Sequence, residues 1–298
     1  MKVKILTSTS SFGSYDVSPL NKLRDADFEV IGNPYKRKLS REEVLALLPG
    51  VTGLIAGVEP LDRDVLQQSQ LRVISRVGAG VSNIDLKAAE RLGIKICSTP
   101  DAPTNAVAEL TIAGMLTCLR KISWMDRDLH AGKWQRQDGY QLEGKNVAII
   151  GFGRIGRRVA ELLMPFNVHL LIVDPFCSDK SIRTVTLETA LSQADIITFH
   201  TSGDECILSR DLFKILKPGV VICNAARGGL IDESALIDYL DAGGILGCWL
   251  DTFENEPYKG RLSTYQNVVL TPHVGSFTRE CRIKMEMQAV DNLIHALS

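Results

Sequence analysis

This sequence lacks the features that mark several classes of protein. No segment holds the roughly 18 consecutive apolar residues that a membrane-spanning helix needs, and the opening MKVKILTSTSS has too short an apolar run for a signal peptide. Neither sign of charge is in excess, with 34 basic and 35 acidic side chains. Such a balance gives no basic surface for nucleic acid or an anionic membrane. We therefore expect a cytoplasmic protein that binds neither nucleic acid nor a membrane.

Cysteine and histidine are too scattered to form a metal site. The seven cysteines include no CxxC pair, and no two of the five histidines have the spacing of metal ligands. Cys97, Cys118, Cys223 and Cys248 lie within apolar runs, which is typical of buried, reduced thiols. We expect neither a bound metal nor a disulfide framework.

The chain does contain a regular alternation of strand-like and helix-like segments. SREEVLALL at 40–48 begins with a serine cap and an acidic first turn, and NIDLKAAERLG at 83–93 ends on glycine, as helices commonly do. Strands that alternate with helices predict βα units on a parallel sheet. The short apolar, β-branched runs that predict strands are residues 2–7, 28–32, 53–57, 71–78, 94–99, 146–151, 169–174, 194–201, 220–226, 246–251 and 267–273.

These runs fall into two series, which predict two α/β domains. A chain of 298 residues is long enough for about two domains, each with its own core. Residues 99–121 lie between the series and predict a long helix with little polar face, which we expect to be buried between the domains or against a second subunit. Residues 276–297 predict a final amphipathic helix.

The stretch VAIIGFGRIGRRVAELL has the pattern of a dinucleotide-binding turn. Gly151, Gly153 and Gly156 stand in G-x-G-x-x-G spacing after an apolar strand and at the start of a helix. In this context the glycines permit a tight turn, close approach of a pyrophosphate, and close packing of helix on strand. Asp174 ends the next predicted strand, where a carboxylate accepts hydrogen bonds from the adenosine ribose and repels the extra phosphate of NADP. The sequence therefore predicts NAD as the cofactor.

Three further side chains suit hydride chemistry on a 2-oxo acid. Arg227, in NAARGGLIDESAL, offers a planar fork for a carboxylate. His273 offers a proton donor, because the unperturbed pKa of histidine is about 6.5. Glu256 offers a carboxylate that favours the protonated imidazole.

Each of these residues follows a predicted strand of the second series, so we expect them to converge at the carboxyl edge of one sheet. Taken singly, each has a simpler interpretation. Arg227 can brace a helix end, His273 can be a loop histidine, and Glu256 can be a surface acid. Their common position at consecutive strand ends favours the catalytic interpretation.

Six motifs in order resemble those of the D-isomer-specific 2-hydroxyacid dehydrogenase family. They are VGAGVSNID at 77–85, NAVAEL at 105–110, the glycine turn, NAARGGLIDESAL, LDTFENEP and TPHVGSFT. The resemblance implies that Arg227 binds the substrate carboxylate, that His273 is the acid/base, and that Glu256 pairs with it. It also implies a Rossmann NAD domain (101–274) inserted into a flavodoxin-like substrate domain (1–100 and 275–298), and a homodimer through the 102–122 helix region.

The resemblance also implies binding residues. For the substrate they are Val77, Gly78, Ala79, Gly80 and Arg227. For NAD they are Gly151, Gly153, Arg154, Ile155, Gly156, Asp174, His200, Thr201, Ala225, Ala226, Asp251 and Gly275. Two of these keep a structural alternative: His200 can be a core histidine, and Asp251 can cap a turn.

Within the family, VGAGVSNID and NAVAEL look most like the phosphoglycerate dehydrogenase branch, so 3-phosphoglycerate is one candidate substrate. Two departures weaken the case for a phosphorylated substrate, and the alternative is a hydroxypyruvate or glyoxylate reductase. The third strand is followed by GVEPL, without the arginine that many members of that branch carry there for the phosphate, and Ser82 stands where the family usually has aspartate. Arg76 is a candidate substitute. No C-terminal regulatory domain is expected, and Glu256 argues against a formate dehydrogenase, which pairs the histidine with glutamine. An NAD-sensing, corepressor-like binding protein is the alternative from another functional class.

Overall fold

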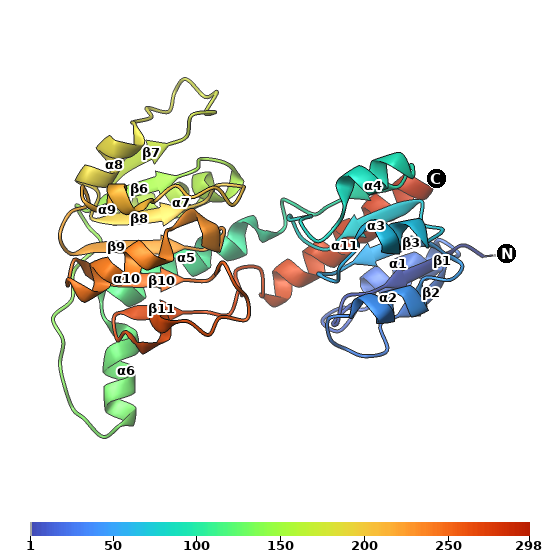
Figure 1. The fold of residues 1–298 in the computed structure, drawn as a ribbon, viewed down its shortest axis with the longest axis horizontal. Helices are drawn as coiled ribbons and strands as arrows, with labels where there is room; N and C mark the ends of the chain where they lie inside the picture. Colours follow the sequence, from blue (N-terminus) through green and yellow to red (C-terminus); the bar gives the residue numbers. More distant parts are fainter. Residues whose placement is uncertain (1) are drawn as a thin grey trace. The chain divides into compact units, whose positions relative to one another are not determined.

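The computed structural model describes residues 2–298 and divides the chain into two compact units (Figure 1). Unit 1 comprises Met1–Pro103 and Ser276–Ser298, and unit 2 comprises Thr104–Gly275. The breaks fall within three residues of the boundaries expected from the sequence. Within residues 2–298, no helix combines the length and the apolar character needed to cross a membrane.

Unit 1 is built on a five-stranded sheet in which every strand pair is parallel. The strand order β2-β1-β3-β4-β5 is the flavodoxin-like order, which confirms the predicted fold of this part. The elements of unit 1 are β1 (Lys4–Thr7), α1 (Ser18–Asp25), β2 (Glu29–Gly32), α2 (Arg41–Leu47), β3 (Val51–Ala56), α3 (Arg63–Gln67), β4 (Val73–Arg76), α4 (Leu86–Arg91), β5 (Lys95–Cys97) and α11 (Arg279–Leu297).

Both faces of this sheet are covered because alternate side chains of its strands are apolar. Leu6, Leu54 and Ile74 pack with α2, α3 and α4 into one core. On the other face α11 contacts β3, β4 and β5, and Leu293 lies against Gly53. A methyl group at Gly53 would stand 3.2 Å from the Leu293 side chain and 3.3 Å from that of Leu297, so the small residue lets the last helix lie close to the sheet.

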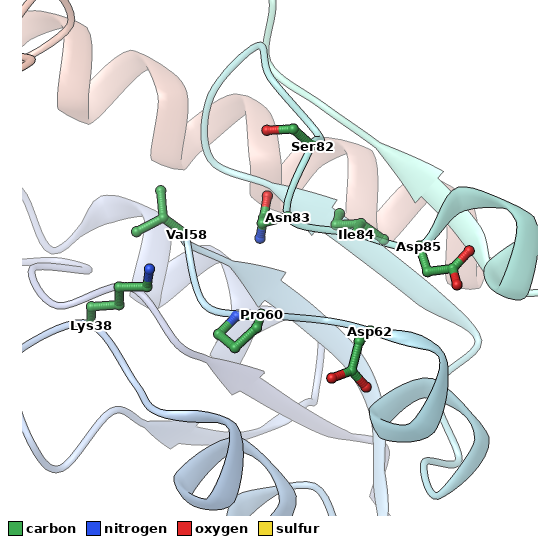
Figure 2. Close-up of a pocket in the computed structure, with 8 residues that line it drawn as sticks. All are labelled: Lys38, Val58, Pro60, Asp62, Ser82, Asn83, Ile84 and Asp85. Carbon is green, nitrogen blue, oxygen red and sulfur yellow. The ribbon is translucent and has the colours of Figure 1, made fainter. Parts of the chain in front are cut away.

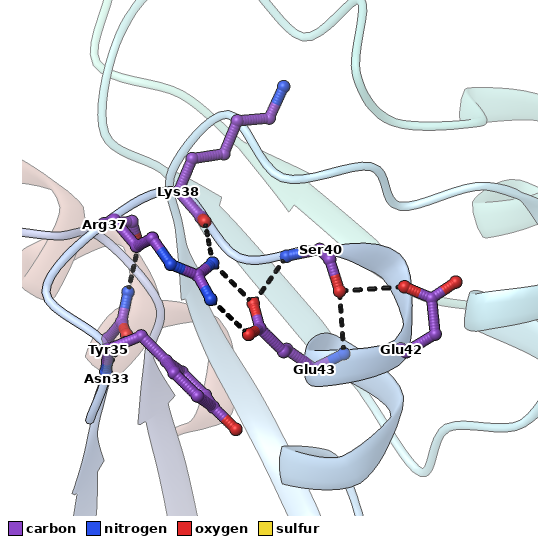
Figure 3. A network of polar contacts seen from close by, with 7 residues as sticks. All are labelled: Asn33, Tyr35, Arg37, Lys38, Ser40, Glu42 and Glu43. Atoms are coloured by element: carbon purple, nitrogen blue, oxygen red, sulfur yellow. Dashed lines mark hydrogen bonds and ion pairs between the residues drawn. The ribbon is translucent and has the colours of Figure 1, made fainter.

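The start of α2 shows how local sequence sets an element boundary (Figure 3). The Ser40 hydroxyl accepts from the Glu43 N–H at 3.3 Å, and the Glu43 carboxylate accepts from the Ser40 N–H at 2.9 Å. This reciprocal pair satisfies two N–H groups that a helix start leaves without partners. Arg37 donates to the same carboxylate at 2.8 and 2.5 Å.

Unit 2 is built on a six-stranded parallel sheet in the order β11-β10-β9-β8-β6-β7. A single parallel bridge between Ile172 and Thr184 marks where a further strand would lie beyond β7. With that bridge counted, the order is that of a Rossmann sheet, as the sequence predicts. The elements of unit 2 are α5 (Pro103–Leu119), α6 (Ile122–His130), β6 (Asn146–Ile150), α7 (Arg154–Leu163), β7 (His169–Val173), α8 (Leu187–Gln193), β8 (Ile196–Phe199), α9 (Arg210–Phe213), β9 (Val220–Asn224), α10 (Glu233–Asp241), β10 (Ile245–Leu250) and β11 (Val268–Leu270), with short 3-10 helices at Met164–Phe166, Gly228–Leu230 and Arg261–Thr264.

The apolar helix between the two series is buried in a way that differs from expectation. Its buried residues, including Ala108, Met115 and Cys118, join the core formed with α7 on one face of the unit 2 sheet. Gly114 lies so close to Trp249 of β10 that any side chain there would overlap the indole. The helix lacks a polar face partly because it packs on the sheet of its own unit.

Candidate active site

The turn between β6 and α7 leaves an open helix N-terminus. Gly151 has a φ of 95°, and a methyl group there would stand 2.7 Å from the His200 backbone. A methyl group at Gly156 would overlap the Gly151 carbonyl. Gly153 caps α7 without a side chain, and nothing lies within 4 Å of the position its Cβ would take. The first and third glycines serve packing, and the second leaves space for an anion before the helix.

Other polar groups lie at the carboxyl ends of strands in the same sheet. Asp174, after β7, accepts from the N–H groups of Phe152 at 2.7 Å and Phe176 at 2.8 Å. The hydroxyls of Thr201, after β8, and Thr252, after β10, are buried and have no hydrogen-bond partner among residues 2–298. Buried polar groups are rarely left unpaired, so these two hydroxyls are free to bond to a bound group. Thr252 was not among the predicted contacts, although it directly follows Asp251.

His200 is the predicted contact that fits this group least. Its Nε2 lies 2.9 Å from the Thr198 hydroxyl, within the strand. Desolvation lowers the pKa of His200 to about 3, so the ring is neutral near pH 7. These contacts favour its structural alternative, and its predicted role toward NAD stays a prediction.

Asp251 holds the loop that carries His273. The Asp251 side chain is fully buried, and its Oδ1 accepts from the Thr271 hydroxyl at 2.6 Å and from the Val274 N–H at 2.9 Å. Its Oδ2 accepts from the Gly275 N–H at 2.8 Å. Three bonds to one five-residue loop fix its path on both sides of His273. The NAD contacts predicted for Asp251 and Gly275 stay predictions.

His273 and Glu256 form the expected pair. The His273 Nδ1 lies 2.9 Å from the Glu256 Oε2, and the other oxygen of Glu256 accepts from the Phe253 N–H at 3.1 Å. The backbone of His273 has a φ of 53°, a conformation that few residues other than glycine adopt. Because Nδ1 faces the carboxylate, the pair presents Nε2 outward, and Nε2 has no partner among residues 2–298. That nitrogen is placed to exchange a proton with a ligand.

Arg227 projects from a turn that small residues and one amide make possible. The Asn224 side chain is buried and bridges the turn, because it donates to the Arg227 carbonyl at 2.7 Å and accepts from the Ala226 N–H at 3.0 Å. A methyl group at Gly228 would overlap the backbone of Phe253. The guanidinium is 42% exposed; its Nη1 donates to the Ala226 carbonyl at 2.6 Å, and its Nε lies 3.9 Å from the carboxylate of Asp204.

The topology brings the three catalytic candidates to one edge of the unit 2 sheet. Arg227 follows β9, Glu256 follows β10 and His273 follows β11, and these three strands are neighbours in the sheet. Since all are parallel, their carboxyl ends share an edge.

In unit 1, some N–H groups of the VGAG turn after β4 donate hydrogen bonds and others do not. The Val77 N–H donates to Ala56 O at 2.9 Å, and the Gly78 N–H donates to the Thr99 hydroxyl at 2.7 Å. The N–H groups of Ala79 and Gly80 make no hydrogen bond within residues 2–298. Of the four predicted contacts, the N–H groups of these two are therefore available to a substrate.

The chain matches a known family model over most of unit 2. Residues 112–275 match "D-isomer specific 2-hydroxyacid dehydrogenase, NAD binding domain". The chain belongs to this family. The prediction made from the six motifs is thereby confirmed.

Individual relatives are similar to this chain over most of its length. The hydroxypyruvate reductase of Thermotoga maritima is 34% identical over 272 residues, which are 87% of this chain and 89% of that protein. The D-3-phosphoglycerate dehydrogenase of Archaeoglobus fulgidus is 35% identical over 274 residues, but this chain spans only 52% of its length. The crystal structure of the TT0316 protein from Thermus thermophilus has a TM-score of 0.91 at 31% identity, covering 99% of this chain and 97% of that one.

The turn after β3 carries the first of the two sequence departures. Where an arginine was expected for a phosphate, Gly57 and the buried Glu59 follow the strand. The Glu59 carboxylate accepts from the Gly57 N–H at 3.1 Å and from the Ser8 hydroxyl. The Gly57 N–H is therefore already bonded to a carboxylate and is not available to an anion. Arg76 donates to the Val77 carbonyl and lies over Gly78, at the VGAG turn.

The second departure, Ser82, lines a cavity of about 440 Å³ in unit 1 (Figure 2). The cavity lies beside the segments that follow β3 and β4, and the Lys38 side chain extends toward Val58. Its carboxylates are already engaged: Asp62 and Asp85 accept from the first turns of α3 and α4. No predicted site residue lines it; its walls are Lys38, Val58, Pro60, Asp62, Ser82, Asn83, Ile84 and Asp85.

Proposed function

We propose that this protein is an NAD-dependent oxidoreductase that interconverts a small D-2-hydroxy acid and its 2-oxo acid. The observation that carries the proposal is the Glu256–His273 pair, 2.9 Å apart, on the same sheet edge as Arg227. A carboxylate-binding cation and a proton donor at one edge, beside a dinucleotide turn, are what this reaction requires.

In this proposal Arg227 binds the substrate carboxylate. The planar guanidinium forms two parallel charge-assisted hydrogen bonds to a carboxylate, which fix the plane of the 2-oxo acid. Its Nη2 makes no hydrogen bond within residues 2–298. To bind with two hydrogen bonds, the substrate carboxylate accepts one from Nη2. It accepts the other from Nη1, which then leaves the Ala226 carbonyl, or from Nε, which then leaves Asp204.

His273 supplies the proton in the reductive direction. Protonated His273 donates from Nε2 to the carbonyl oxygen as C2 accepts hydride, and the neutral ring takes the proton back in the oxidative direction. The carboxylate of Glu256 fixes the orientation of the ring through its contact with Nδ1. Asp251 acts at one remove, through the loop.

The residues of unit 2 fit a nicotinamide dinucleotide. The open N-terminus of α7 suits the pyrophosphate, Asp174 suits the adenosine ribose, and the unpaired hydroxyls of Thr201 and Thr252 offer further hydrogen bonds. When bound, the cofactor supplies or accepts the hydride.

A panel of 2-oxo acids tests the function. With NADH, we expect the purified protein to reduce at least one of hydroxypyruvate, glyoxylate, pyruvate, 2-oxoglutarate and 3-phosphohydroxypyruvate, followed as loss of NADH absorbance. Binding of NADH without turnover of any of these acids would contradict the proposal and favour an NAD-sensing binding protein.

Replacing Asp174 by asparagine is expected to narrow the preference for NADH over NADPH. The carboxylate repels the 2′-phosphate of NADPH, and asparagine keeps an acceptor for the Phe152 N–H but not the charge. We expect the ratio of kcat/KM values for the two cofactors to fall by about tenfold, the effect of about 1.4 kcal/mol. Asp179→Asn serves as the control, because it removes one negative charge from the same segment between β7 and α8. An unchanged ratio in Asp174→Asn would count against the ribose contact.

We also propose the homodimer through the 102–122 region. Apolar side chains there remain half-buried or exposed in the single chain, including Leu110, Ile112, Leu116 and Ile122. Light scattering on the preparation used for the panel tests this, and a mass of 32.8 kDa would contradict it.

A further inference from the structure

The carboxylate of Asp204 stands beside the arginine to which we assign the substrate. Its Oδ1 lies 3.9 Å from the Arg227 Nε, and among residues 2–298 no other carboxylate forms an ion pair with that guanidinium. Asp204 lies on the segment that follows β8, and its side chain is 77% exposed. The proposed mechanism has no use for this carboxylate.

The position of Asp204 is set by the backbone. Ile207 and Leu208 both donate their N–H groups to the Leu230 carbonyl at 2.9 Å, and the Asp232 N–H donates to the Leu208 carbonyl at 3.1 Å. These bonds tie the segment after β8 to the one that follows Arg227. Closer to Asp204, a methyl group at Gly229 would stand 2.8 Å from the Asp204 carbonyl. The two segments are in contact at this point, so Asp204 stays near Arg227 when its side chain rotates.

This arrangement has a consequence for any anion that binds Arg227. A substrate carboxylate that engages Nε takes the place of the Asp204 carboxylate, which then remains a few ångströms away with its charge. Like charges at that separation repel, and the repulsion grows with the charge of the ligand. An acid with a second anionic group is therefore disfavoured more than one with a single carboxylate.

We propose that Asp204 is a specificity-determining residue that restricts the substrate to singly charged 2-oxo acids, at the expense of phosphorylated or dicarboxylic ones. The inference rests on the proposed function, because it takes Arg227 as the carboxylate-binding group. The substrates named for two relatives differ in charge. Hydroxypyruvate carries one carboxylate, and 3-phosphoglycerate carries a phosphate as well. Asp204 favours the first class for this chain.

The test compares hydroxypyruvate with 3-phosphohydroxypyruvate, which differ by the phosphate alone. With NADH, wild type is expected to show the higher kcat/KM on hydroxypyruvate. Asp204→Asn is expected to lower KM for hydroxypyruvate by about two- to fivefold, the range for exposed ion pairs, and to lower KM for the phosphorylated acid by more. The ratio of kcat/KM for hydroxypyruvate to kcat/KM for the phosphorylated acid therefore falls in the variant. Raising the ionic strength should reduce the difference in this ratio between variant and wild type.

Glu205→Gln is the matched control, because it removes one exposed negative charge from the neighbouring position. We expect it to leave the selectivity unchanged. Asp204→Ser, a second neutral variant at the exposed position, should behave like Asp204→Asn.

Three results would overturn the inference. They are equal selectivity in Asp204→Asn and wild type, an equal effect of Glu205→Gln, and a wild-type preference for the phosphorylated acid. In each of these cases the protein still turns over a 2-oxo acid, so the proposed function survives. Failure of wild type on both acids and on the rest of the panel would instead remove the proposed function, and this inference with it.

Discussion

His273→Asn is expected to lower kcat for 2-oxo acid reduction by about 10²- to 10⁴-fold, the usual contribution of a positioned general acid. The free Nε2 of His273 is the proton donor in the proposed site, and asparagine has no proton that it can transfer near neutral pH. KM should change little, because Arg227 rather than His273 binds the substrate carboxylate. Steady-state kinetics on the best acid of the panel, with NADH binding measured by fluorescence, checks both parts.

His169→Asn provides the control, since His169 is an exposed histidine at the start of β7. It should retain wild-type rates.

Glu256→Gln is a second variant that tests the pair: it keeps an acceptor for the Phe253 N–H but removes the charge beside His273. We expect it to lower kcat with little change in KM, because the imidazole loses the charged partner that orients it while Arg227 still binds the acid. Near-normal kcat in a folded His273→Asn protein would refute the assignment.

Arg227→Ala is expected to lower kcat/KM by about 30- to 5,000-fold, which corresponds to the roughly 2–5 kcal/mol lost when one partner of a hydrogen-bonded charge pair is removed. The loss should appear in KM as well as kcat, since the guanidinium both binds and orients the acid. Arg227→Lys keeps the charge but not the fork, so we expect it to recover binding better than turnover.

Arg210→Ala is the matched control, because Arg210 is another exposed arginine of unit 2 that bridges to Asp238 on the surface. Exposed pairs of this kind contribute about 0–1 kcal/mol to stability, and its activity should be unchanged. The Arg227→Ala backbone is held by the Asn224 side chain, which does not depend on the guanidinium. If Arg227→Ala matched wild type, carboxylate binding would have to be assigned to another residue.

The strands were readable from the sequence because parallel strands are buried on both faces. Each of the eleven apolar runs overlaps a strand, from β1 at Lys4–Thr7 to β11 at Val268–Leu270. Such runs are continuous in sequence and need no information about neighbours. The helix Pro103–Leu119 is different. Its apolar character predicts burial but does not name the covering surface, which Trp249 provides from a strand more than 130 positions later.

The site divides in the same way. Arg227, Glu256 and His273 were predicted because each stands at a strand end and has a side chain suited to one step. Of the two carboxylates beside them, Asp204 was not predicted, and Asp251 was predicted as an NAD contact with a turn cap as its alternative. Asp204 lies in an irregular segment, and nothing in SGDEC indicates that its carboxylate meets Arg227. The role of Asp251 as the brace of the His273 loop depends on three hydrogen bonds made 20 to 24 positions away.

The sequence by itself determined the two parallel sheets, the dinucleotide turn and the family, since these depend on local patterns of apolar residues, glycines and strand-end polar groups. Only the tertiary structure decided which N–H groups of the VGAG turn remain available, how the Glu59 carboxylate fills the turn after β3, and which carboxylate lies beside Arg227. These facts depend on hydrogen bonds and charge separations across distant segments. Such interactions fall off within a few ångströms, whereas spacing along the chain says little about distance in space.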